Sequence, residues 1–335
     1  MEHHSQGKVS VIRALVGNTF VTLMKGAVFF FTGSASMYAE AVHSLADTLN
    51  QSLLLVGINR SRRPADSMHG YGYGIERFFW SLISACGILF IGSGVVIYNS
   101  LESLYHQSTI NLADFNLLSM SVLFVAFVVE GWTLWSAIKE LKHNRKLSWG
   151  IFKDGDPILL AIIYEDSVAV VGVIIALLAQ GLTYITGSVF YDAMGGLLVG
   201  LVLGFLSILL IIKNHQYIVG KSLGHRITKD IIEALEEDPC IEKVVEFKSV
   251  AVGIGKYRIF ATVEWNGSPL YEEIYEAGDL KEEFEEVKKD FKKFAKLMFK
   301  TTDRIPRLVG SHIDMIEKNI VDKFPEVSYV DIEIN

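Results

Sequence analysis

Four polar residues within one apolar stretch have the spacing that would gather them on a single helix face. They occur three, four and three residues apart in the run MYAEAVHSLADTLNQ, and they are Glu40, His43, Asp47 and Asn50. Residues three or four apart lie on the same face of a helix. Imidazole and carboxylate groups are ligands for zinc and other first-row divalent ions. The pattern therefore predicts a helix with one face able to hold a divalent cation.

Further acidic residues occur inside apolar stretches, where Lys25 is the only basic residue away from the ends. They are Glu130 in VAFVVEGWTLW, Glu165 and Asp166 in AIIYEDSVAVVG, and Asp192 in FYDAMGG. A charged group at the middle of a bilayer costs roughly 2.5–3.5 kcal/mol on insertion scales, so these acids must be protonated, bind cations, line water or hydrogen-bond between helices. Metal ligands bind metal only when deprotonated, and protons therefore compete with metal. Such competition is a mechanism for exchange.

Six apolar stretches are long enough to span a bilayer, which takes about 20 residues. They lie near residues 9–32, 36–58, 76–101, 115–138, 157–180 and 188–212. Lys and Arg gather in the second–third and fourth–fifth connections and after the sixth stretch, whereas the other connections have none. The positive-inside rule then predicts six transmembrane helices with both termini in the cytoplasm.

The composition changes after the sixth stretch. Of the 335 residues 50% are hydrophobic, but residues 221–335 carry 18 Lys/Arg against 24 Asp/Glu, compared with 13 against 14 before them. We predict a membrane domain over 1–215 and a soluble acidic domain over 216–335. An acidic domain argues against nucleic acid as a partner, since phosphate binding needs a positive surface. Two cysteines are too few for a disulfide framework or a cysteine zinc cluster.

The soluble part has alternating helical and strand patterns. Their order is helix, strand, strand, helix, strand, with a hairpin turn at Gly253–Gly255 and Pro306 in the first turn of the second helix. This order predicts a ferredoxin-like α+β domain with helices on one face of the sheet. A charged helical insertion is expected near 271–300.

The motifs resemble those of the cation diffusion facilitator family. The run GSASMYAEAVHSLADTLNQ is similar to its second span, PADSMHGYGYGIERF to the link into its third, and SVFYDAMGGLLVG to the start of its sixth. The resemblance covers nearly the whole chain and implies six spans, cytoplasmic termini and a ferredoxin-like cytoplasmic domain. The combination of HSLAD and EDS resembles the branch of the mitochondrial zinc transporter nine and its bacterial relatives.

By position, the resemblance makes His43 and Asp47 two metal ligands and puts Asp166 in the place of the Asp in the fifth span. Ile162 stands where the family usually has a His. The predicted site therefore lacks one imidazole. Glu165 can compensate, although it points about 100° away from Asp166 on an ideal helix.

Other residues are candidates for the same site or for a second one. Glu40, Asn50 or water can complete the first metal sphere. Some family members bind a second metal in the second–third link through an Asp and two His. Asp66 and His69 match this pattern, but Tyr73 occupies the place of the second His. The alternative is a solvated loop.

Two features lie outside the family's membrane motifs. Glu130 either relays protons or anchors the helix bundle.

Some family members bind a zinc pair in the cytoplasmic domain through several His and acidic residues. The soluble part contains only His225 and His312, and no such cluster is visible in the sequence.

The sequence therefore predicts a homodimeric, proton-coupled exporter of divalent metal that works by alternating access around a midplane site. The metal and the proton are transported, and no cofactor is expected. Zinc is the first choice because of His43, while manganese, iron and cobalt stay open because carboxylates suit harder ions. The lack of long loops favours a bacterial cytoplasmic membrane.

Three other classes compete with this prediction. One is a membrane sensor that signals through its soluble part, but that part shows no catalytic group of residues. A proton-coupled carrier of organic cations would use the same acids without metal. An intramembrane metalloenzyme needs strong zinc ligands and an activated water, and the chain has no H-E-x-x-H pattern. We therefore do not expect an enzyme.

Overall fold

The computed structural model describes residues 2–106, 117–144, 157–269, 284–285, 287–288 and 290–335. The chain forms two compact units, Met1–Ile218 and Val219–Asn335. Each unit has hydrophobic clusters of its own, so each is built around its own core.

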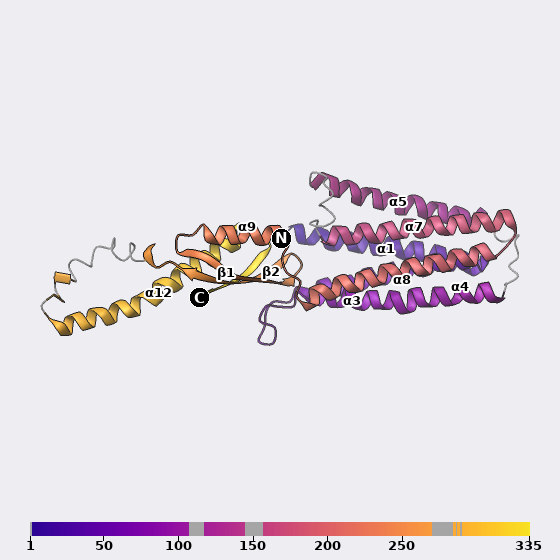
Figure 1. Cartoon of the computed structure of the whole chain (residues 1–335). Helices are drawn as coiled ribbons and strands as arrows, with labels where there is room; N and C mark the ends of the chain where they lie inside the picture. Colours follow the sequence, from indigo (N-terminus) through magenta and orange to yellow (C-terminus); the bar gives the residue numbers. More distant parts are fainter. Residues whose placement is uncertain (1, 107–116, 145–156, 270–283, 286, 289) are drawn as a thin grey trace. The chain divides into compact units, whose positions relative to one another are not determined.

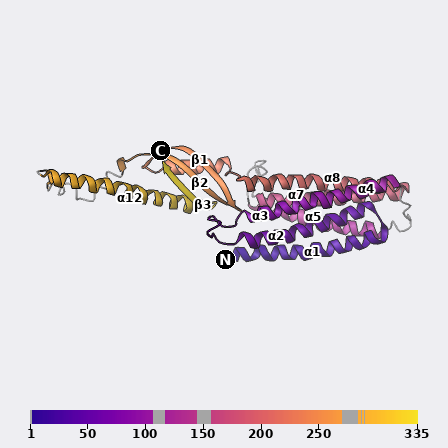
Figure 2. The ribbon, with the colours of Figure 1, turned by 90° about the horizontal axis from the view of Figure 1, so that it is seen from below.

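Long helices that run side by side form the N-terminal unit (Figure 1; Figure 2). In the described residues they are α1 (Glu2–Thr32), α2 (Ala35–Ser61), α3 (Glu76–Gly87), the π-helical η1 (Ile88–Ser93), α4 (Gly94–His106), α5 (Leu117–Asn144), α7 (Pro157–Thr186) and α8 (Phe190–Val219). Because α3, η1 and α4 follow one another without a break, helix occurs in each of the six apolar stretches.

Four of the described helical segments are long and apolar enough to cross a membrane. They are Glu76–Tyr105, Ser119–Ser136, Tyr164–Thr186 and Phe190–Val219. Large apolar side chains on these segments face outward: Phe90 is 73% exposed and Phe205 is 62% exposed. Apolar surfaces of this kind are unfavourable in water and favourable in contact with lipid. Helices α1 and α2 are less apolar, so six crossings with cytoplasmic termini stay a prediction.

Glycines on α8 allow its neighbours to approach closely. A Cβ atom at Gly196 would lie 2.9 Å from the backbone oxygen of Ala35, and one at Gly200 would lie 2.9 Å from a methyl carbon of Val96. Neither position accommodates a larger residue without movement. These glycines thus allow α2 and α4 to pack closely against α8.

A carboxylate from α8 holds the start of α2. Asp192 accepts hydrogen bonds from the backbone N–H of Ala35 at 2.6 Å and from the Ser34 hydroxyl at 2.8 Å, and it also accepts one from the Ser36 hydroxyl. The first N–H groups of a helix have no partner within the helix, and a negative charge there is favourable. Asp192 thus positions α2 against α8.

The C-terminal unit has the predicted order of helices and strands. It consists of α9 (His225–Glu236), β1 (Ile241–Gly253), β2 (Lys256–Trp265), α12 (Phe291–Lys323) and β3 (Val327–Ile334). The sheet order is β1-β2-β3. Strands β1 and β2 form the predicted antiparallel hairpin, while β2 and β3 are parallel. The core lies between α9, α12 and the sheet, and includes Ile231, Leu235, Ile259, Ile316 and Ile320.

Helix α12 differs from the prediction of a separate helix that begins at Pro306. Residues 291–323 form one helix, and Pro306 lies inside it. The helix begins earlier because Asp290 accepts hydrogen bonds from the backbone N–H groups of Lys292 and Lys293. Of the predicted insertion near 271–300, residues 271–283 lie outside the described part of the chain.

Candidate metal centre

Two of the four polar residues on α2 form the first half of the site. His43 is 2% exposed, and its Nε2 lies 3.5 Å from Oδ2 of Asp47. Neither ring nitrogen of His43 makes a hydrogen bond within the described part of the chain. Buried polar atoms almost always have a hydrogen-bond partner. The imidazole is therefore available to a ligand, and Asp47 lies next to it.

Helix α7 supplies the other half of the site. The Asn50 side chain donates a hydrogen bond of 2.9 Å to Oε1 of Glu165, which ties α2 to α7. Asp47 acts electrostatically on both Glu165 and Asp166. Three carboxylates and one imidazole thus come together from two helices. Like charges in a poorly hydrated region repel strongly, so this cluster favours a bound cation or protons.

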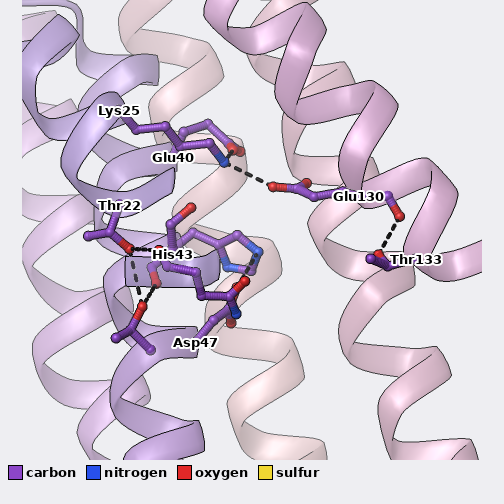
Figure 3. A network of polar contacts seen from close by, with 10 residues as sticks. Thr22, Lys25, Glu40, His43, Asp47, Glu130 and Thr133 are labelled. Atoms are coloured by element: carbon purple, nitrogen blue, oxygen red, sulfur yellow. Dashed lines mark hydrogen bonds and ion pairs between the residues drawn. The ribbon is translucent and has the colours of Figure 1, made fainter. Parts of the chain in front are cut away.

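The remaining acid on α2 belongs to a different group. Lys25 of α1 donates hydrogen bonds to Glu40 of α2 at 2.8 Å and to Glu130 of α5 at 3.0 Å (Figure 3). The Lys25 and Glu40 side chains are fully buried, and that of Glu130 is 18% exposed. Three helices meet at this ion triad. The anchoring contact proposed for Glu130 is therefore present.

Sequence reasoning did not assign partners to Lys25. The signal was available, because a lysine inside an apolar span is almost always paired. Glu40 is held by Lys25, and its second oxygen, Oε1, has no hydrogen-bond partner in the described residues. A Cβ atom at Gly172 of α7 would lie 2.8 Å from that oxygen. Gly172 thus makes room for the Glu40 carboxylate.

The triad and the candidate metal ligands are electrostatically linked. His43 feels the charges of Glu40 and Glu130 as well as that of Asp47. Figure 3 shows Glu40, His43 and Asp47 along the same helix, with Lys25 and Glu130 reaching toward Glu40 from its neighbours. A change of charge at His43 is therefore sensed by the triad.

Hydrogen bonds within the loop between α2 and α3 occupy Asp66. Its Oδ2 accepts a bond of 2.7 Å from the Tyr73 hydroxyl, and its Oδ1 accepts bonds from the backbone N–H groups of Met68 and His69. These bonds, that from Tyr73 above all, lower the pKa of Asp66. His69 Nδ1 lies 3.6 Å from Asp66 Oδ1. This geometry favours the solvated-loop alternative over a second metal site.

One predicted feature of the site lies outside the described residues. Ile162 belongs to α7, but its side chain is not within the part that the structure describes. The residues that the structure brings together are therefore His43, Asp47, Glu165 and Asp166, with Asn50 as a hydrogen-bond donor.

The chain is similar in sequence to several known proteins. Residues 11–219 match the family described as the cation efflux transmembrane domain. Over 335 residues the chain is 35% identical to the human protein named proton-coupled zinc antiporter SLC30A9, mitochondrial, which covers 98% of this chain and 58% of the relative. It is also 32% identical over 342 residues to metal tolerance protein C4 of Arabidopsis thaliana, covering 99% of this chain and 74% of the relative.

A shorter match joins the chain to a bacterial protein. The magnetosome protein MamM of Paramagnetospirillum magneticum is 34% identical over 95 residues, which are 28% of this chain and 29% of the relative. The chain spans 58% of the length of human SLC30A9, so the relative contains sequence with no counterpart here.

Proposed function

The chain belongs to the cation diffusion facilitator family, whose membrane part is the cation efflux transmembrane domain, and from this premise we propose that it exports a divalent metal ion in exchange for protons. It is a multi-pass membrane protein, and members of this family are transporters and not enzymes. The chain spans less than two thirds of human SLC30A9, so the transported ion is argued from the residues of this chain.

The observation that carries the proposal is the buried imidazole of His43 beside carboxylates from two helices. His43, Asp47 and Asp166 hold the metal, and Glu165 joins them once it leaves Asn50. One nitrogen and several oxygens form a sphere that zinc accepts, and the name of the human relative includes zinc. Manganese, iron and cobalt are the alternatives, because carboxylate oxygens also suit those ions.

Proton exchange follows from the same ligands. Carboxylates and imidazole bind metal in their deprotonated forms, so arriving protons release the metal. Glu130 has its anchoring contact with Lys25, and we therefore favour its structural role over proton relay. Alternating access requires α2 and α7 to separate on one side of the site at a time. The Asn50–Glu165 bond is one of the contacts between them that must break, and the Gln180–Ser36 bond is another.

We expect the protein to act as a homodimer with both termini in the cytoplasm, as the family resemblance implies. A bacterial cytoplasmic membrane is our expectation for this chain, whereas the human relative is named as mitochondrial.

Flux in liposomes tests the proposal. Purified protein is reconstituted, and an internal dye records uptake of zinc, manganese, iron, cobalt and cadmium with and without a pH gradient. We expect gradient-stimulated flux in the wild type, none in Asp47→Ala, and unchanged flux in the control Asp66→Asn, whose carboxylate lies in the exposed loop. Metal flux that survives in Asp47→Ala would refute the site. If the protein transported an organic cation without inhibition by metal, and transported no metal, the organic-cation carrier would be favoured.

A further inference from the structure

A second group of metal-binding side chains lies in the C-terminal unit. The carboxylate of Asp238, the thiol of Cys240 and the imidazole of His312 each offer one ligand atom, and these three atoms lie within 4.8 Å of one another. Asp238 and Cys240 belong to the turn between α9 and β1, whereas His312 is on α12. None of the three is a ligand in the membrane site.

The separations fit a zinc-class ion. Zinc binds sulfur at about 2.3 Å and nitrogen or oxygen at about 2.0–2.2 Å, which places tetrahedral ligand atoms roughly 3.3–3.8 Å apart. Nε2 of His312 already lies 3.3 Å from Oδ1 of Asp238. The widest separation of 4.8 Å closes by side-chain rotations of about 1 Å to reach those bond lengths.

Neighbouring groups orient each ligand. The backbone N–H of Cys240 donates a hydrogen bond of 2.9 Å to Oδ1 of Asp238, which fixes the carboxylate in the turn. The indole of Trp265 on β2 packs edge-to-face against the His312 ring, with ring centres 5.9 Å apart. Supporting contacts of this kind are typical around metal ligands, because they set the direction of the donor atoms.

The site is buried on one side and open on the other. Cys240 is 1% exposed, while the side chains of Asp238 and His312 are each 20% exposed. A thiol at that depth is shielded, and the carboxylate and imidazole face the surface from which an ion would enter. Three protein ligands with an open fourth position are a standard zinc arrangement, with water in the fourth position.

We propose that Asp238, Cys240 and His312 bind a zinc-class ion, with water as the fourth ligand. The contact between Asp238 and His312 holds these two groups together without metal, and zinc binds the thiolate and the neutral imidazole. This site is separate from the transported ion and does not rest on the proposed function.

The position of His312 on α12 indicates what metal binding would do. Ile316 and Ile320, one and two turns further on, are buried in the core of the unit. Toward the start of the helix, Phe291 and Phe299 are 82% and 78% exposed. His312 thus lies where α12 leaves the core. A metal bound there joins α12 to the α9–β1 turn and fixes the helix at that point.

Cobalt spectroscopy of the full chain in lipid nanodiscs tests this site. Cobalt(II) bound to a thiolate has a sulfur-to-metal charge-transfer band in the near ultraviolet. The membrane ligands His43, Asp47, Glu165 and Asp166 include no cysteine, so metal bound by them does not produce this band. We expect the band in the wild type, its loss in Cys240→Ser, and its retention in the matched control Cys86→Ser.

A second variant covers the case in which Cys240→Ser does not fold. His312→Gln changes a partly exposed side chain, and it should keep the thiolate band while weakening cobalt binding by more than the roughly 10–100-fold that loss of a supporting residue costs. Zinc should displace cobalt and abolish the band in the wild type. A wild type without the band, a band that persists in Cys240→Ser, or unchanged affinity in His312→Gln would each overturn the proposal. Loss of liposome flux with the band intact would refute only the transport function.

Discussion

Lys25 and Glu40 form an ion pair of 2.8 Å between α1 and α2, and neither side chain has any exposed surface. Glu40 is one helical turn from His43, so the pair fixes the part of α2 that carries the metal ligands. Glu130 adds a second carboxylate to the same ammonium group. Removing one partner of a buried ion pair leaves an uncompensated charge, which is far costlier than removing an exposed pair.

Lys25→Met is therefore expected to destabilise the membrane unit by about 3–5 kcal/mol, because Glu40 and Glu130 lose their shared partner. Thermal unfolding in detergent measures the effect as a lower melting temperature. Lys229→Met is the control: its ion pair with Glu233 is exposed, and its loss should leave the melting temperature nearly unchanged. Equal melting temperatures for both variants would mean that the triad does not hold the helices.

Gly172→Ala should disturb the same triad from α7. The added Cβ atom would lie 2.8 Å from Oε1 of Glu40, so the carboxylate must shift against Lys25. We expect a destabilisation of about 1–3 kcal/mol from overpacking, with reduced metal flux. Gly131→Ala on α5 is the matched control, because an added Cβ there would meet no other part of the described chain within 4 Å beyond its own stretch of helix, and alanine favours a helix. A stabilised Gly172→Ala would show that the glycine is not needed there.

Ile162→His should add the imidazole that the family usually has in its fifth span. Residue 162 precedes Asp166 by four positions on α7, so both lie on one helix face. We expect the ratio of zinc to manganese flux to rise about tenfold, equivalent to about 1.4 kcal/mol. Ile163→His places the same group about 100° around the helix and should leave the ratio unchanged. If the ratio of zinc to manganese flux changed equally in both variants, position 162 would not be what sets the metal preference.

Tyr73→Phe tests the hydrogen bonds of the loop between α2 and α3. The Tyr73 hydroxyl is the main cause of the lowered pKa of Asp66, so its removal should raise that pKa toward the ordinary value. A carboxyl group with a lowered pKa stabilises the loop above its ordinary pKa, and this support is lost as the pH falls through the lowered value. In Tyr73→Phe the support should be smaller, and its loss should be complete at a higher pH.

NMR titration of the Asp66 carboxyl carbon measures the change. Tyr98→Phe, on α4 and outside the loop, is the control and should leave the pKa of Asp66 where it is. An unaltered titration in Tyr73→Phe would assign the lowered pKa to the backbone donors of Met68 and His69 instead.

Local patterns in the sequence determined the elements and part of the site. Apolar runs of bilayer length predicted the helices of the N-terminal unit, and period-two alternation with Gly253–Gly255 predicted the β1–β2 hairpin. The four-residue spacing of His43 and Asp47 placed them on one face of α2. These predictions succeeded because each depends only on the geometry of a single helix or strand.

The partners of the charged residues depended on the tertiary structure. Lys25 meets Glu130 across 105 residues of chain, Asp192 caps a helix 157 residues before it, and Asp238 meets His312 across 74 residues. Periodicity shows which side chains share a face, but only the packing of helices decides which faces meet. Glu40 is an example. Its spacing groups it with His43, but the packing of α1 and α5 places it in an ion triad with Lys25 and Glu130.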